Sequence, residues 1–209
     1  MIKLCGIRRV EDIYYCNEGL PDYIGFVFAE SKRKVSPDLA RELKAALDPK
    51  IKVCAVTVNA PTDFFAEICG IADIFQLHGD EDNEYISALR RLYPEKEIWK
   101  AARIGSRKDI DGLSRINADK FVLDAFSEDA YGGTGKRIDE KLLYYAKTNL
   151  KKPFFIAGGV DKNNIGEIIE KFSPCGVDLS SSIETNGFKD REKMLEIMSI
   201  YRKINEKRS

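Results

Sequence analysis

Two stretches, Ile2-Lys3-Leu4-Cys5 and Lys120-Phe121-Val122-Leu123-Asp124, decide the fold prediction. Each is a short apolar run that ends in a reactive side chain and is followed at once by a turn or a loop. Nearly continuous apolar character is typical of strands that are buried on both faces. Further runs of this kind give the remaining predicted strands, at residues 23–28, 53–58, 74–77, 98–102, 153–157 and 176–180.

Longer amphipathic segments separate these runs. The helix prediction at 38–47 follows Ser36-Pro37, a common helix start. The other predicted helices cover residues 10–18, 62–69, 82–93, 106–115, 139–148, 163–172 and 190–204. This alternation predicts one α/β domain over residues 1–209, a single (β/α)8 barrel. The alternative is a doubly wound open sheet, which usually has fewer strands.

The barrel prediction brings two reactive side chains together. In such a barrel the carboxyl ends of all strands lie at one face, and that face carries the chemistry. Cys5 and Asp124 each end a predicted strand, so the thiol and the carboxyl are expected on the same rim. They form a candidate acid/base pair.

Composition excludes several classes of function. The chain has 34 basic and 34 acidic residues, so no global positive field recruits nucleic acid or an anionic membrane. Its five cysteines form no C-x-x-C pair and His78 is the only histidine, which excludes the usual structural zinc spacings. We expect no metal, no signal peptide, no membrane helix and a reducing cytoplasmic location.

Loops after the seventh and eighth predicted strands suit a phosphate group. Gly158 and Gly159 follow the seventh strand, and Ser180, Ser181 and Ser182 follow the eighth. Barrels often bind phosphate with these two loops through backbone N–H groups. The alternative is an ordinary turn followed by a helix cap.

Three further segments lie on the predicted rim. The loop 130–136, which contains Gly133, resembles a nucleotide loop, but Ala130 and Arg137 break that motif. A lid over the barrel is favoured there, with Gly133 as a candidate ligand contact and a plain flexible loop as the alternative. In the basic run 30–34, Arg33 is the candidate for binding a carboxylate; the alternative is a solvated charge. His78 is a candidate ligand contact or a structural histidine.

Seven motifs in order resemble the phosphoribosylanthranilate isomerase family of tryptophan biosynthesis, from residue 3 to about residue 190. They are Lys3-Leu4-Cys5-Gly6-Ile7, Gly25-Phe26-Val27-Phe28, Ser31-Lys32-Arg33-Lys34-Val35-Ser36-Pro37, Gln76-Leu77-His78-Gly79-Asp80-Glu81, Gly132-Gly133-Thr134-Gly135-Lys136, Ala157-Gly158-Gly159 and Asp178-Leu179-Ser180-Ser181. Single motifs of this kind are weak signals, whereas seven in register are specific.

The resemblance implies an aldose–ketose isomerase without metal or organic cofactor. The reaction is the Amadori rearrangement of N-(5-phosphoribosyl)anthranilate to the open-chain deoxyribulose phosphate. The family's general base falls on Cys5, its general acid on Asp124 and its carboxylate-binding arginine on Arg33. We therefore expect a lowered pKa for Cys5 and a raised pKa for Asp124. Asp178 is a further candidate ligand contact.

The sequence departs from the family pattern at Arg8, where threonine is usual, at Thr57, where phenylalanine is common, and at Ser182, where glycine is usual. The last departure adds a side chain to the predicted phosphate loop and removes the conformational freedom of glycine there. One alternative function is a related histidine-pathway isomerase, but that enzyme uses two aspartates and has an internal repeat, and Cys5 stands where its first aspartate would be. Another is a non-catalytic binder of phosphorylated ligands. The expected partner is a phosphorylated small molecule, with the chain a monomer or homodimer.

Overall fold

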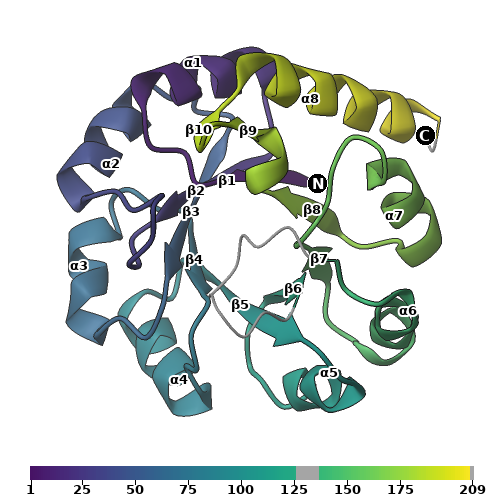
Figure 1. Ribbon diagram of the computed structural model, residues 1–209. Helices are drawn as coiled ribbons and strands as arrows, with labels where there is room; N and C mark the ends of the chain where they lie inside the picture. The colour runs from purple at the N-terminus through teal and green to yellow at the C-terminus, as the bar shows by residue number, and fades with distance from the viewer. Residues whose placement is uncertain (126–136, 208–209) are drawn as a thin grey trace.

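The computed structural model describes residues 1–125 and 137–207, in which eight parallel strands close into a barrel with the helices around it (Figure 1). Neighbouring strands pair in chain order, and β1 also pairs with β8 through Lys3 and Asp178. This pairing confirms the barrel and excludes the open sheet. The strands are β1 (Ile2–Cys5), β2 (Tyr23–Val27), β3 (Lys52–Thr57), β4 (Ile74–Leu77), β5 (Glu97–Ile104), β6 (Lys120–Ala125), β7 (Phe154–Ile156) and β8 (Gly176–Leu179).

The helices follow the predicted segments with one exception. They are α1 (Val10–Gly19), α2 (Pro37–Ala45), α3 (Phe65–Ile68), α4 (Asn83–Leu92), α5 (Arg107–Leu113), α6 (Glu140–Asn149), α7 (Ile165–Phe172) and α8 (Arg191–Glu206). At α2 the Ser36 hydroxyl accepts a hydrogen bond from the Leu39 N–H, and Pro37 begins the first turn. The predicted helix 62–69 is instead a 3-10 turn, η1 (Thr62–Phe64), followed by the short α3.

Alternation along the strands separates an outer core from the barrel interior. Side chains such as Ile2 and Leu4 pack in the large core that includes the helices, so Lys3 and Cys5 on the other face of β1 point inward. Tyr23, Trp99 and Phe155 fill the interior near the strand starts, with the rings of Tyr23 and Trp99 5.0 Å apart. This apolar layer closes one end of the barrel and leaves the other end for polar groups.

A small hairpin after β8 was not predicted. It consists of β9 (Glu184–Thr185) and β10 (Phe188–Lys189), which follow the 3-10 turn η2 (Ser181–Ile183). Arg8 donates hydrogen bonds to the carbonyls of Lys32 and Gly187, so it ties the hairpin to the loop that carries Arg33. Arg8 is one of the departures from the family pattern, and this contact gives it a structural role.

Within residues 1–125 and 137–207, no helix has the length and apolar character needed to cross a membrane.

Candidate active site

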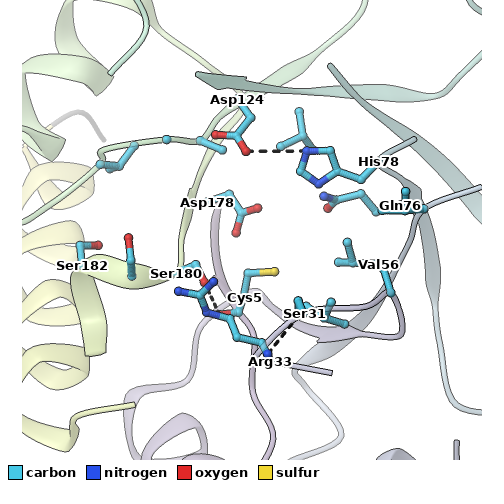
Figure 2. A pocket seen from close by; sticks show the side chains of 18 of the residues that line it. Cys5, Ser31, Arg33, Val56, Gln76, His78, Asp124, Asp178, Ser180 and Ser182 are labelled. Atoms are coloured by element: carbon cyan, nitrogen blue, oxygen red, sulfur yellow. Dashed lines mark hydrogen bonds and ion pairs between the residues drawn. The ribbon is translucent and has the colours of Figure 1, made fainter. Parts of the chain in front are cut away.

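A cavity of about 360 Å³ opens at the carboxyl ends of the strands (Figure 2). Every described residue that was predicted for the site lines this cavity. Gly133, with the predicted lid, lies outside the described residues. The lining residues from that prediction are Cys5, Arg33, His78, Asp124, Gly158, Gly159, Asp178, Ser180, Ser181 and Ser182. The barrel thus brings together residues that are up to 177 positions apart in the sequence, from Cys5 to Ser182.

The acid and base candidates lie on opposite sides of this cavity. Figure 2 shows Asp124 beside His78 at one side and Cys5 near Arg33 at the other, with Asp178 between them. Gly25 on β2 gives Cys5 its space, because a β-carbon there would lie 2.6 Å from the Cys5 sulfur. A substrate that occupies the cavity can therefore meet a carboxyl group and a thiol at two different atoms.

The surroundings of Asp124 make its carboxyl group a weaker acid than an exposed aspartic acid. Its carboxyl accepts a hydrogen bond of 2.9 Å from the Ala125 N–H, and its side chain is largely buried. Burial raises its pKa to about 6, with the Ala125 N–H opposing the rise and Asp178 adding to it. Gly158 packs against the carboxyl in the left-handed region (φ +71°), where a β-carbon would lie 2.7 Å from Asp124 Oδ1. The predicted rise in the pKa of Asp124 is confirmed.

His78 lies next to this acid as a neutral imidazole. Its Nε2 is 3.7 Å from Asp124 Oδ2, which is too long for a hydrogen bond. Burial, with the positive charges of Lys3 and Lys100, lowers the pKa of His78 to about 4. Near neutral pH the ring therefore carries no charge that would hold Asp124 as a carboxylate.

Cys5 differs from the sequence prediction. Burial raises the pKa of its thiol above the ordinary value, whereas a lowered pKa was expected. The positive charges of Lys3 and Lys189 oppose the rise, and Asp178 adds to it. The expectation was wrong because it followed from the role of a base, which requires a thiolate, and left out the desolvation of a thiol inside the barrel.

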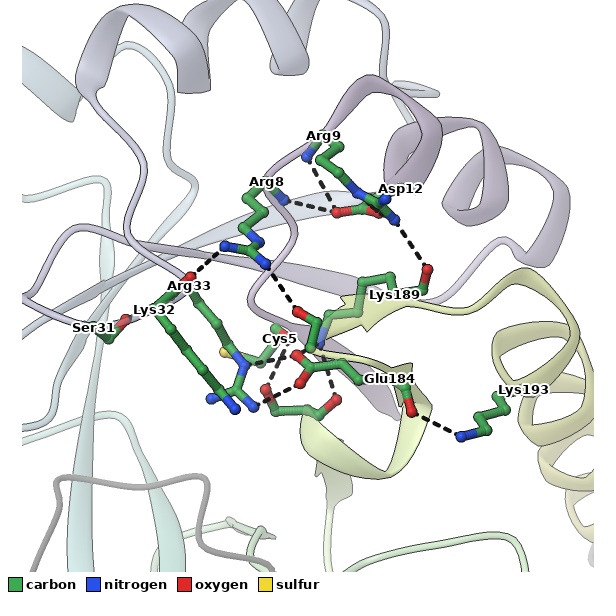
Figure 3. A network of polar contacts seen from close by, with 12 residues as sticks. Cys5, Arg8, Arg9, Asp12, Ser31, Lys32, Arg33, Glu184, Lys189 and Lys193 are labelled. Carbon is green, nitrogen blue, oxygen red and sulfur yellow. Dashed lines mark hydrogen bonds and ion pairs between the residues drawn. The ribbon is translucent and has the colours of Figure 1, made fainter.

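Arg33 reaches the cavity as part of an ion-pair network (Figure 3). Its Nε and one terminal nitrogen bind the two carboxylate oxygens of Glu184 at 2.7 and 2.9 Å. Lys189 binds the same carboxylate at 2.8 Å and the Ser180 carbonyl at 2.9 Å. Burial alone would raise the pKa of Glu184, but Arg33 and Lys189 hold it at about 2. A ligand carboxylate at Arg33 would bind the remaining terminal nitrogen.

The two candidate phosphate loops offer different groups. Gly158 and Gly159 both have left-handed backbones, with φ of +71° and +66°. The Ser180 hydroxyl donates to the Cys5 carbonyl at 3.1 Å, so it supports the base and is already engaged. The Ser182 hydroxyl is buried and has no hydrogen-bond partner in the described part of the chain. The departure from glycine at 182 therefore adds a hydroxyl group to the cavity wall.

Buried polar atoms without partners indicate a polar ligand. Asp178 Oδ1, His78 Nε2 and Ser182 Oγ all belong to residues that line the cavity, and none has a hydrogen-bond partner among the described residues. Leaving a buried polar group unpaired costs about 1–3 kcal/mol. A ligand with several hydroxyl or phosphate oxygens would satisfy them. Within the described ranges, no three His, Cys, Asp or Glu side chains are placed to share a metal ion.

Comparison with known proteins identifies the family. Residues 2–199 match the family described as N-(5'-phosphoribosyl)anthranilate (PRA) isomerase. The chain belongs to the PRA isomerase family. The PRA isomerase of Acetivibrio thermocellus is 43% identical over 200 residues, which cover 92% of this chain and 91% of that protein.

Solved structures of PRA isomerases have the same barrel. The enzyme from Thermus thermophilus superposes with a TM-score of 0.86 at 24% identity, over 97% of this chain and 98% of that one. Another PRA isomerase structure, with a TM-score of 0.81 at 24% identity and the same coverage, holds reduced 1-(o-carboxyphenylamino)-1-deoxyribulose 5-phosphate. At this identity the two structures support the fold.

Three charged residues around Cys5 in this PRA isomerase family member were not predicted as site residues. Lys3 reads as part of an apolar strand, and Glu184 and Lys189 lie in the hairpin that the sequence pattern did not predict. Lys3 carried a usable signal, because a lysine on the inward face of a barrel strand must be paired. Nothing in the local sequence distinguishes Lys189 from a surface lysine.

Proposed function

We propose that this chain catalyses the Amadori rearrangement of N-(5-phosphoribosyl)anthranilate in tryptophan biosynthesis, with Asp124 as general acid and Cys5 as general base. The observation that carries the proposal is their placement on opposite sides of one cavity, together with the raised pKa of Asp124. A carboxyl group whose pKa lies near 6 can still donate a proton close to neutral pH. The free cysteines suit a reducing compartment, and we place the reaction in the cytoplasm.

In the first step Asp124 protonates the ring oxygen of the ribose. The C1′–O bond breaks, and the nitrogen lone pair forms the C1′=N bond of an iminium ion. Asp124 becomes a carboxylate. His78, neutral and 3.7 Å away, is placed to donate a hydrogen bond to that carboxylate after a small movement.

In the second step the Cys5 thiolate removes the proton from C2′. The electrons of the C2′–H bond form a C1′=C2′ bond, and the iminium nitrogen regains its lone pair. The enolamine then loses its hydroxyl proton and gains a proton at C1′, which gives the ketone. The iminium acidifies the C2′ proton, so a thiolate is a sufficient base.

The remaining cavity residues bind and orient the substrate in this proposal. Gly158, Gly159, Ser181 and Ser182 hold the phosphate, with Ser180 beside them bound to the Cys5 carbonyl, and Asp178 Oδ1 accepts a hydrogen bond from a sugar hydroxyl. Ser182 Oγ and Asp178 Oδ1 support this assignment because both are buried without partners in the described residues. Arg33 takes the anthranilate carboxylate with the nitrogen that Glu184 leaves free for it.

An activity assay tests the proposed function. Phosphoribosylanthranilate is generated in situ and its fluorescence is followed after the purified protein is added. We expect a loss of fluorescence that is proportional to the protein concentration. A rate equal to the spontaneous decay of the substrate would contradict the proposal.

Arg33→Ala is expected to act mainly on binding. Loss of a charge-assisted hydrogen bond costs about 1.5–3 kcal/mol, so KM should rise by ~10-fold to ~150-fold while kcat changes less. Lys32→Ala is the matched control, because it removes the same charge from an exposed neighbour. An unchanged KM in Arg33→Ala would show that another group holds the carboxylate.

The pH dependence of kcat/KM follows from the two raised pKa values. The competent enzyme carries the Cys5 thiolate and the protonated Asp124. Below about pH 6 nearly all Asp124 side chains are protonated, and the fraction of Cys5 present as thiolate grows with pH, so kcat/KM rises. Above that pH the loss of the acid offsets the gain of thiolate, which gives a plateau. Once pH exceeds the raised pKa of Cys5, the rate falls.

The plateau is the specific prediction for this pH profile. The substrate phosphate also loses a proton near pH 6, so the affinity for the reduced product analogue is measured over the same pH range. If the pH dependence of analogue affinity changes slope at the same pH as kcat/KM, the change in slope is due to ionisation of the phosphate. A profile that keeps rising through pH 8 would show that the acid form of Asp124 is not required.

A further inference from the structure

Lys3 is a fully buried lysine inside the barrel. Its side chain is 0% exposed, and its Nζ lies 2.6 Å from Asp178 Oδ2. The two residues are register partners in the pairing of β1 with β8, so the backbone itself holds the contact. A buried ion pair of this kind contributes little to stability relative to an apolar pair of the same volume. The stability of the fold therefore does not account for it.

Alternation along β1 places Lys3 next to Cys5. The two side chains are two residues apart on one strand and point to the same inward face. Cys5 lies at the cavity and Lys3 is not among the residues that line it, so the ammonium lies below the thiol. Asp178 lies between the ammonium and the cavity, because one of its oxygens binds Lys3 and its side chain also lines the cavity.

The charges around Cys5 favour a thiolate. Three buried cations, Lys3, Arg33 and Lys189, face two buried anions, Asp178 and Glu184 (Figure 3 shows the part around Glu184). The cluster carries a charge of +1 with Cys5 as a thiol and is neutral with Cys5 as a thiolate. Uncompensated charge is costly in a buried site, so the thiolate completes the cluster.

Lys3 is the cation that acts most strongly on the thiol. Its charge favours the Cys5 thiolate more than that of Lys189 does. Arg33 and Lys189 both bind Glu184, whose carboxylate lies between them. The neighbouring strands add no further charge beside the thiol. Gly25 on β2 has no side chain, and burial raises the pKa of Cys54 on β3, so that thiol stays neutral. Burial alone would lower the pKa of Lys3, but Asp178 and Cys5 raise it, so the ammonium persists across the working pH range.

We propose that Lys3 is a positioning residue of the reaction: its ammonium, held on Asp178, supplies the positive charge that stabilises the Cys5 thiolate. This inference rests on the proposed role of Cys5 as general base. It assigns Asp178 a second task, since the carboxylate fixes the lysine while its other oxygen faces the substrate.

The pH dependence of Cys5 alkylation tests this inference independently of any isomerase activity. Iodoacetamide is added over a range of pH, and the Cys5 peptide is quantified by mass spectrometry after digestion. The Cys69 peptide in the same digest is the internal control, because Cys69 lies outside the barrel at the end of α3. The assay therefore reports on Lys3 even if the chain does not isomerise the expected substrate.

Lys3→Met and Asp178→Asn are expected to shift the alkylation midpoint of Cys5 in opposite directions. Lys3→Met should raise it by about one pH unit or more, which slows alkylation at a fixed lower pH by ~10-fold. Asp178→Asn should lower it, because the ammonium then faces the thiol without its counter-ion. Cys69 should react equally in all variants. In the isomerase assay, Lys3→Met should lower kcat/KM on the acidic limb by a factor similar to the loss of thiolate, with a smaller change in KM.

The double variant Lys3→Met/Asp178→Asn is included in case Lys3→Met alone does not fold. It leaves no unpaired buried carboxylate, and it should keep part of the upward shift because Lys3 has a larger effect on Cys5 than Asp178 has. An unchanged midpoint in both lysine variants would overturn the inference, as would shifts in the same direction for Lys3→Met and Asp178→Asn. Either result would make Lys3 a structural partner of Asp178 alone.

Discussion

Cys5→Ser is expected to lower kcat by a factor of about 10²–10⁴ or more, because the variant loses a positioned base. A serine hydroxyl has a pKa far above that of a thiol and supplies no basic anion near neutral pH. The substitution is nearly isosteric, and Gly25 leaves the space beside residue 5 unchanged, so the fold should be preserved. The measurement is the fluorescence assay at saturating substrate.

Cys69→Ser is the matched control for this variant, because Cys69 lies outside the cavity at the end of α3. It should retain the wild-type kcat. Near-wild-type turnover in Cys5→Ser would remove Cys5 from the role of base.

Asp124→Asn is expected to stop ring opening while the ligand still binds. The amide has the shape of the carboxyl group, so the hydrogen bond from the Ala125 N–H and the packing of Gly158 should persist. Its N–H protons are far too weakly acidic to protonate the ring oxygen, and turnover should fall by about 10²–10⁴-fold. Affinity for the reduced product analogue should stay within a few-fold of the wild type.

Asp38→Asn, at an exposed carboxyl in α2, is the control for loss of a negative charge. If Asp124→Asn loses analogue affinity and turnover equally, Asp124 is a structural anchor of the rim. Asp178 would then be the next candidate for the general acid, since its carboxyl also lines the cavity.

Most of the fold follows from patterns within the sequence. Runs such as 53–58 are nearly continuous in apolar character because each strand is buried between the interior and the helices, and this pattern is visible in the sequence. The exceptions are short elements. The segment 62–69 has a helical pattern, but only Phe65–Ile68 form an α-helix, after a 3-10 turn. Each strand of the hairpin at 184–189 is only two residues long, which is too short to show a periodic pattern in the sequence.

The site was predicted less completely than the fold. Strand ends identify Cys5 and Asp124, because a barrel topology alone brings those positions together. The pKa of Cys5 was predicted in the wrong direction, since desolvation depends on how the interior packs around the thiol. The partner of Arg33 was also missed. Glu184 lies 151 residues away, and only the folded hairpin brings it to the guanidinium.

The comparison of binding and turnover in one set of proteins tests the central claim, that Cys5 and Asp124 act as the base and acid of an isomerase. Wild type, Cys5→Ser and Asp124→Asn are titrated with reduced 1-(o-carboxyphenylamino)-1-deoxyribulose 5-phosphate, and each preparation is then assayed for turnover. We expect analogue affinities within a few-fold of one another and turnover lower by about 10²-fold or more in both variants. Affinity and turnover that fall together, or turnover that persists in either variant, would contradict it.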